Sequence, residues 1–141
     1  MVVICKELCD GGIFHRDIKD ENILVNTQTL EVKVIDFGCA TEFETEKTYS
    51  TASGTPEFFP PETFTKNQYR AGPATVWALG TLLYVIVMGD IPFEEPKNII
   101  SGHREKVNIV TNYFVFMSNG SQGDIENKQS TQRNSKILKF V

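Results

Sequence analysis

The sequence predicts an α+β fold that is mainly helical, with one small β-hairpin. Apolar residues at positions 1, 4, 5 and 8 have the spacing of one helical face, and this pattern ends at Asp10-Gly11-Gly12. Two β-branched runs, at 23–25 and 32–35, flank a polar turn at 26–29. Residues 76–88 form the most hydrophobic stretch of the chain and predict a second helix.

The hairpin is expected to bring two polar residues together. Asn22 directly precedes the first strand, and Asp36 directly follows the second. Because the strands of a hairpin are antiparallel, both positions lie at the same end, and we expect their side chains to converge. An amide carbonyl and a carboxylate are hard oxygen ligands of the kind that Mg²⁺ prefers. Gly38 lets the backbone turn sharply after Asp36.

The hydrophobic stretch at 76–88 contains thirteen residues. A helix that crosses a bilayer needs about twenty. We therefore expect a helix that is apolar on all sides, is buried within the protein and does not enter a membrane.

Two motifs carry the chemistry: HRDIKDEN at 15–22 and DFG at 36–38. In phosphoryl transfer, a carboxylate such as that of Asp17 orients the attacking hydroxyl and takes its proton. An ammonium such as that of Lys19 neutralises charge on the phosphates. Isolated HRD or DFG tripeptides also occur by chance in ordinary loops, but a hairpin links the two here, which weakens that alternative.

Four motifs in this order resemble the Pim family of serine/threonine protein kinases: 15–22, 36–38, 54–62, and 76–80 running on to 89–94. The resemblance covers about residues 1–103 and implies a protein-kinase-like fold that transfers the γ-phosphoryl group of ATP, with Mg²⁺, to Ser or Thr. It implies that Asp17 is the base, that Lys19 contacts the phosphates, and that Asn22 and Asp36 hold the metal. The Pim-like departures from most kinases are Pro60 in the 60–62 motif and Thr75, where most kinases have aspartate.

The resemblance also implies residues that recognise the substrate. Glu21, Asp90 and Glu94 match acidic positions that face arginines upstream of the target residue, while Val85 departs from a further acid. Thr55 matches the threonine that bridges the catalytic aspartate and lysine. Phe58, with Phe59, matches the wall of the pocket beside the target residue, and simple packing of these two rings is the alternative.

Regulation is expected where the chain runs between Asp36 and Glu62, a stretch here called the activation segment. In related kinases the arginine at the position of Arg16 pairs with a phosphate or an acid on this segment. This chain offers hydroxyls at those positions, and we expect phosphorylation of one of them to order the segment: Thr48, Ser50, Thr51 and Ser53.

Several parts of a kinase are not found. Neither a glycine-rich loop nor a strand lysine with its partner glutamate precedes His15. We therefore expect residues 1–103 to be a partial kinase domain, a mainly helical C-lobe fragment that is catalytically silent by itself. Missing neighbours would leave apolar patches exposed on the first helix and on the flanks of 76–88. A complete enzyme of this kind is expected to be a monomer.

Charge is distributed unevenly along the chain. Residues 1–96 contain 7 Lys and Arg against 15 Asp and Glu, a net charge of −8, whereas residues 97–141 carry +4. An acidic body argues against nucleic acid as a partner and suits protein substrates with basic residues upstream of Ser or Thr.

Three cysteines and the absence of a signal-peptide pattern predict a reducing compartment, cytoplasmic or also nuclear. Cys5 and Cys9 lie one helical turn apart. No pair of histidines completes a metal site with them, so we interpret both as core residues. Cys39 is interpreted as a small packing residue.

Residues 104–141 are predicted to form a divergent, largely disordered tail. Apolar runs at 107–110 and 113–117 are followed by 119–136, where Ile125 is the single apolar side chain. Such a tract cannot offset its ordering entropy. Two alternatives to a kinase stay open: a pseudokinase-like fragment that binds a partner through its apolar surfaces, and a truncated gene product without stable function.

Overall fold

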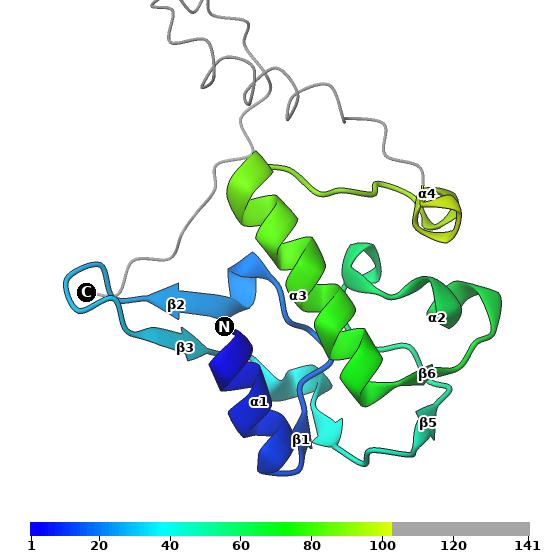
Figure 1. Ribbon diagram of the computed structural model, residues 1–141, viewed down its shortest axis with the longest axis horizontal. Coiled ribbons are helices and arrows are strands. Elements are labelled where there is room, and N and C mark those ends of the chain that lie inside the picture. The colour runs from blue at the N-terminus through cyan, green and yellow to red at the C-terminus, as the bar shows by residue number, and fades with distance from the viewer. Residues whose placement is uncertain (103–141) are drawn as a thin grey trace, which may run out of the picture.

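The structure, a computed structural model, describes residues 1–102, which adopt an α+β fold (Figure 1). The long helix α3 (Ala71–Met88) crosses the molecule. The helix α1 (Val2–Asp10) and a hairpin lie on one side of it, and α2 (Pro61–Thr65) lies on the other. The remaining elements are short: β1 (Ile13–Phe14), η1 (Asp20–Asn22), β2 (Ile23–Val25), β3 (Val32–Val34), η2 (Phe37–Cys39), β4 (Thr41–Glu42), β5 (Thr48–Tyr49), η3 (Pro56–Phe58), β6 (Tyr69–Arg70) and α4 (Pro96–Ser101).

The first helix and the hairpin are confirmed where the sequence predicts them. The backbone N–H of Gly11 donates to the carbonyl of Glu7 at the end of α1. Strands β2 and β3 pair antiparallel, with Ile23 opposite Val34 and Val25 opposite Val32. Asn22 therefore directly precedes β2, and Asp36 follows soon after β3, at the same end of the hairpin.

Two clusters of buried side chains form the core of the described residues. The first joins α1, the hairpin and α3 through Cys5, Ile18, Ile23, Phe58, Ala78 and Leu82. The second consists of Phe14, Tyr49, Tyr69, Ala71 and Ala74. Cys5 is 3% exposed, which confirms its interpretation as a core residue. Burial raises the pKa of its thiol, and the neighbouring Cys9 raises it further.

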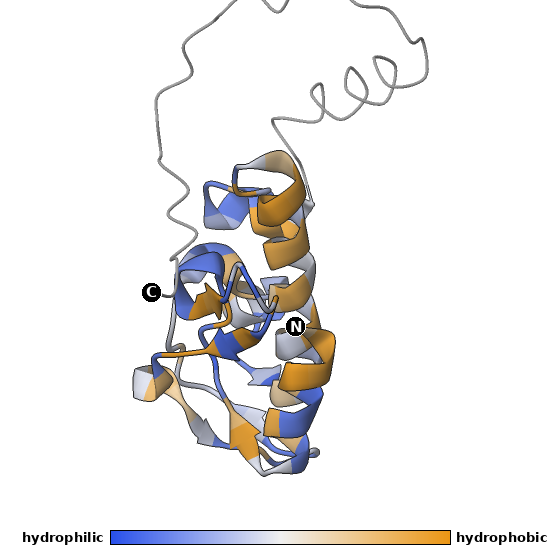
Figure 2. Ribbon diagram, turned by 90° about the vertical axis from the view of Figure 1, so that its left-hand side faces the viewer, coloured by the Kyte–Doolittle hydropathy of each residue, from blue (hydrophilic) through white to orange (hydrophobic). Residues whose placement is uncertain are grey.

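The expectation that residues 76–88 are buried on all sides is wrong for the part of the chain that the structure describes. Helix α3 is longer than predicted, and one face of it is open: Val76, Leu83, Ile86 and Val87 are 62–70% exposed. Val2 and Val3 of α1 are also exposed, so the predicted apolar patches on both helices are confirmed. Figure 2 shows α1 and α3 along one edge of the molecule, with α3 coloured mainly hydrophobic.

Helix α3 also meets a simple criterion for a membrane-spanning segment. Its 18 residues are long and apolar enough to cross a membrane by length and composition alone. Core helices of soluble proteins meet the same criterion, so this is weak evidence. The absence of membrane association stays a prediction.

The activation segment is held by two short pairs of strands. β1 pairs with β4 near its start, and β5 pairs with β6 further along. The Tyr49 hydroxyl donates to the carbonyl of Glu42 at 2.6 Å, and the Tyr69 hydroxyl donates to the carbonyl of Thr51 at 2.8 Å. These contacts order the backbone on both sides of the predicted regulatory hydroxyls. The prediction of a disordered tail at 104–141 falls outside the described residues.

Candidate active site

Asp17 is a buried carboxylate at the centre of a polar network. It lies in the loop between β1 and η1, and it is 8% exposed. Its Oδ1 accepts hydrogen bonds from the backbone N–H of Thr55 at 2.9 Å and from the Thr55 hydroxyl at 2.7 Å. Its Oδ2 accepts from the side-chain amide of Asn22 at 3.0 Å and lies 3.4 Å from Nζ of Lys19. Three residues therefore fix the orientation of this carboxylate.

The network also sets the charge of Asp17. Burial by itself raises the pKa of the carboxyl group, because the charged form loses water. The hydrogen bonds from Thr55, the positive charge of Lys19 and the amide of Asn22 together outweigh burial, so the pKa of Asp17 lies below its ordinary value. The side chain is consequently an anion at neutral pH, able to accept a hydrogen bond or a proton.

Thr55 connects the catalytic loop to the activation segment. Its hydroxyl accepts a hydrogen bond from Nζ of Lys19 at 2.7 Å while donating to Asp17. The three side chains therefore form a closed triangle of contacts. The ammonium of Lys19 is still partly exposed. The Asp17 carboxylate can therefore act on a hydroxyl while the ammonium contacts a phosphate beside it.

The two candidate metal ligands lie at the same end of the hairpin. The amide nitrogen of Asn22 is used by Asp17, which leaves the amide oxygen as its atom for a cation. The backbone N–H of Ile35 donates to the Asn22 carbonyl at 2.9 Å, which ties the residue before Asp36 to Asn22. Asp36 is exposed, has a φ of 59°, and accepts from the N–H of Gly38 through Oδ1. The donor chemistry suits Mg²⁺, although residues 1–102 contain no group of three His, Cys, Asp or Glu placed to hold a metal.

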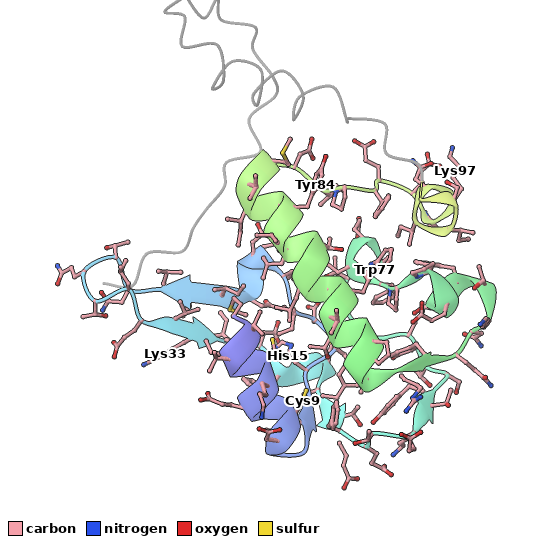
Figure 3. All side chains as sticks on the ribbon, viewed as in Figure 1. Cys9, His15, Lys33, Trp77, Tyr84 and Lys97 are labelled. Carbon is pink, nitrogen blue, oxygen red and sulfur yellow. The ribbon has the colours of Figure 1, made fainter. Side chains whose placement is uncertain are left out.

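His15 is buried and connects the motif at 15–22 to the chain just before the motif at 36–38. Its Nδ1 accepts from the backbone N–H of Asp17 at 3.3 Å, and Nε2 lies 3.1 Å from the carbonyl of Ile35. These partners assign the hydrogen to Nε2. The ring also meets Phe37 edge to face at 4.8 Å. Figure 3 shows His15 close to α1 and α3. Burial lowers the pKa of His15, more than the Ile35 carbonyl and the nearby carboxylates raise it, so the ring is neutral.

Gly54 is a functional position that sequence reasoning missed. Its φ is +113°, and a Cβ atom there would lie 2.4 Å from the carbonyl oxygen of Arg16 and 3.2 Å from Oδ1 of Asp17. Only glycine lets the activation segment approach the catalytic loop closely enough for Thr55 to reach Asp17. A glycine before Thr55 is visible in the sequence, but nothing in its neighbours shows the contact.

Arg16 faces a small cavity beside the activation segment. Its Nε donates to the carbonyl of Cys39, and its φ is 68°. The cavity, about 30 Å³, is also lined by Ser53 and by Thr63, whose buried hydroxyl has no hydrogen-bond partner among residues 1–102. Of the predicted regulatory residues, Ser53 therefore lies at the Arg16 cavity, while Thr51 is exposed.

Thr75 makes no hydrogen bond to the catalytic loop in the described structure. Its hydroxyl donates to the carbonyl of Ala71 in its own helix at 2.8 Å. The position nevertheless touches two cavities, that of Arg16 and a smaller one beside His15. The aspartate that most kinases have at this position would adjoin the same two cavities.

The predicted substrate residues occupy separate elements. Glu21 is exposed in η1, and Asp90 and Glu94 lie in the loop between α3 and α4. Phe58 is 6% exposed and belongs to the first core cluster, so its surroundings favour the packing interpretation. Phe59 is half-buried beside Phe64 at 6.1 Å.

Comparison with known proteins identifies the family. The sequence model described as "Protein kinase domain" matches residues 5–141. The chain belongs to the protein kinase family. It is 52% identical over 100 residues to the serine/threonine-protein kinase pim-2 of Danio rerio, a match that covers 70% of this chain and 32% of that protein.

Other serine/threonine protein kinases match the same chain. The kinase prk-2 of Caenorhabditis elegans is 40% identical over 103 residues, 73% of this chain and 23% of its own length. The calcium/calmodulin-dependent protein kinase type I of Schizosaccharomyces pombe is 37% identical over 98 residues, 67% of this chain and 29% of its own. The chain thus spans about a third or less of the length of these relatives. It is a serine/threonine protein kinase domain sequence, and ATP and Mg²⁺ are usual for this family.

Gly54→Ala should destabilise the protein because the left-handed φ and the clash with Arg16 must both be accommodated. Backbone strain of this kind costs about 1–3 kcal/mol. The matched control is Gly72→Ala, because a Cβ at this helical glycine meets no atom within 4 Å. That change should be neutral or stabilise by up to about 1 kcal/mol. Urea unfolding of both variants tests this, and equal stabilities would contradict the close approach at Gly54.

The neutral state of His15 predicts a pH dependence of stability. Because its pKa is lowered in the folded protein, the unfolded chain binds a proton at a pH where the folded one does not. The free energy of unfolding should therefore fall as pH drops through about 6.5 and level off below the folded pKa. In urea titrations between about pH 7.5 and 5.5, His15→Asn should remove this slope. The same slope in both proteins would show that another group is responsible.

Proposed function

We propose that this chain forms the catalytic-loop part of a Pim-type serine/threonine kinase that phosphorylates basic peptides. The observation that carries the proposal is the Asp17 carboxylate, which is held by Thr55, Asn22 and Lys19 and kept ionised. A fixed, ionised carboxylate beside an ammonium suits transfer of a phosphoryl group to a hydroxyl.

Each side chain has a defined part in this mechanism. Asp17 accepts a hydrogen bond from the substrate Ser or Thr hydroxyl and takes its proton as the oxygen attacks the γ-phosphorus of ATP. The bond between this phosphorus and the β–γ bridging oxygen breaks, and ADP leaves with the bonding electron pair. Lys19 lies within reach of Asp17 and contacts the transferred group, which offsets its negative charge. Asn22 and Asp36 would hold Mg²⁺ through their side-chain oxygens, and a bound Mg²⁺ would neutralise charge on the phosphates. The Thr55 hydroxyl bonds to both Asp17 and Lys19 and so fixes their side chains relative to each other.

Acidic residues support a preference for basic protein substrates. Glu21 and Glu94 are exposed and Asp90 is half-buried, and residues 1–96 carry a net charge of −8. Arginines upstream of the target residue would be attracted to such a surface. We also propose a monomer in the cytoplasm or nucleus. No observation specifically favours the binding-only alternative.

Arg16 is proposed as the receptor for a phosphate on the activation segment. Arg16 and Ser53 line the same cavity, and Thr51 lies exposed two residues before Ser53. A phosphoryl group on either would form a charge-assisted pair with Arg16.

Nucleotide binding should depend on a divalent metal. Calorimetric titration with ATP in the presence of Mg²⁺ should show binding that EDTA removes, because Asn22 and Asp36 reach the phosphates through the metal. Asp36→Ala should abolish the metal-dependent binding. Asp10→Ala is the control, since Asp10 is exposed at the end of α1 and pairs with Lys6. Equal affinity of the unaltered chain with Mg²⁺ and with EDTA would rule out this site.

Phosphoryl transfer should depend on Asp17. The assay joins the chain in frame to the N-terminal part of the Danio rerio relative and measures radiolabelled transfer to an arginine-rich serine peptide. Asp17→Asn should lower the rate by roughly 10²–10⁴-fold, the usual contribution of a general base. Asp20→Asn, an exposed neighbour in η1, should retain activity. The double change Thr51→Ala and Ser53→Ala should lower turnover if Arg16 receives a phosphate. Undiminished transfer in Asp17→Asn would reject the catalytic assignment.

A further inference from the structure

Both faces of helix α3 are mainly apolar, but one face is buried and the other is exposed. Its buried residues are Ala71, Ala74, Ala78, Thr81 and Leu82. The exposed residues Val76, Leu83, Ile86 and Val87 lie on the opposite side, because offsets of 7, 10 and 11 residues fall within about 100° of arc on a helix. The helix contains no charged side chain, so nothing on it adapts the open face to water.

Helix α1 extends this open face. It contacts α3, and its Val2 and Val3 are 71% and 67% exposed. Figure 2 shows α1 and α3 along the same edge of the molecule, with α3 coloured mainly hydrophobic and α1 of mixed colour. The exposed apolar residues Val2, Val3, Val76, Leu83, Ile86 and Val87 are here called the α1/α3 face. Contiguous apolar surfaces of this kind are usually covered in a folded protein.

The chain itself contains a segment whose composition matches this face. Residues 107–117, VNIVTNYFVFM, include eight apolar side chains in eleven positions. Neither the phosphoryl-transfer chemistry nor the substrate residues use this segment. In the sequence it is the sole apolar run after Gly102 long enough to cover several turns of a helix.

The length of the chain and its charge distribution both allow residues 107–117 to contact the α1/α3 face. Residues 103–106 separate the segment from the end of α4, and the extended chain spans about 3.3–3.6 Å per residue. Tether and segment together therefore extend further than α3, whose 18 residues measure about 27 Å. Residues 1–96 carry −8 and residues 97–141 carry +4, so attraction between opposite charges favours the approach of the tail to the body, and the short tether makes the body of the same chain its nearest partner.

We propose that residues 107–117 of the same chain cover the α1/α3 face. This contact would bury Leu83, Ile86 and Val87 under the aromatic residues of the segment. It is independent of the phosphoryl-transfer function, because it involves the side of α3 opposite the first core cluster, which holds Ala78 and Leu82.

Photo-crosslinking in the full chain tests the proposal. Leu83 is replaced by p-benzoylphenylalanine, and crosslinked peptides are mapped by mass spectrometry in an equal mixture of ¹⁴N and ¹⁵N protein. The expected product joins position 83 to 107–117 within one isotope. Leu30, 74% exposed in the turn between β2 and β3, is the matched control and should give little of this product. Crosslinks of mixed isotope would show a second copy on the face, and this result or the absence of a crosslink to 107–117 would overturn the proposal.

A second measurement uses variants in the segment. Phe114→Asp and Val115→Asp should uncover the face and raise the fluorescence of a bound apolar dye such as ANS. Ser121→Asp adds the same charge outside the segment and should leave the fluorescence unchanged. Equal dye binding in all these proteins would contradict the contact even if crosslinks were seen.

Discussion

The contact between Asp17 and Thr55 is the interaction on which the rest of the site depends. It joins residues 38 positions apart, and its atoms are largely shielded from water. A buried carboxylate is costly unless hydrogen bonds satisfy it, so the activation segment must return to the catalytic loop for the loop to be stable. The same bonds that satisfy Asp17 also keep it ionised. Local stability and readiness for chemistry therefore have one physical origin.

Around this contact, the two core clusters support different parts of the chain. The first cluster holds α1, the hairpin and α3 together and so sets the position of Asn22. The second cluster contains the stacked rings of Tyr49 and Tyr69. Because Tyr49 belongs to the activation segment, this cluster anchors that segment. His15 belongs to neither cluster, but it connects the backbone on both sides of the site through its two ring nitrogens.

Elements that depend on local patterns could be predicted from the sequence, and elements that depend on distant neighbours could not. The helical stripe of α1 and the turn of the hairpin are local, and both lie where the pattern places them. The sequence predicts exposed flanks on the helix at 76–88 but does not show that Leu83 is on the open side, because residues on the covered and the open side are alike apolar. Gly54 was missed for a related reason: its partner, the carbonyl of Arg16, is remote in the sequence. The roles of Glu21, Asp90 and Glu94 rest on resemblance, and they stay predictions.

The left-handed backbone of Arg16 and Asp36 has a consequence for how this sequence can change. Both residues have a positive φ, a conformation in which a side chain carries a steric penalty that glycine avoids. They stand on either side of the candidate site, one beside Asp17 and the other at the DFG turn. A glycine at either position would relieve this penalty, but it would also remove the hydrogen bond that Arg16 donates to Cys39 or the one that Asp36 accepts from Gly38. Such a change therefore exchanges backbone strain for the loss of a guanidinium or a carboxylate beside the candidate site.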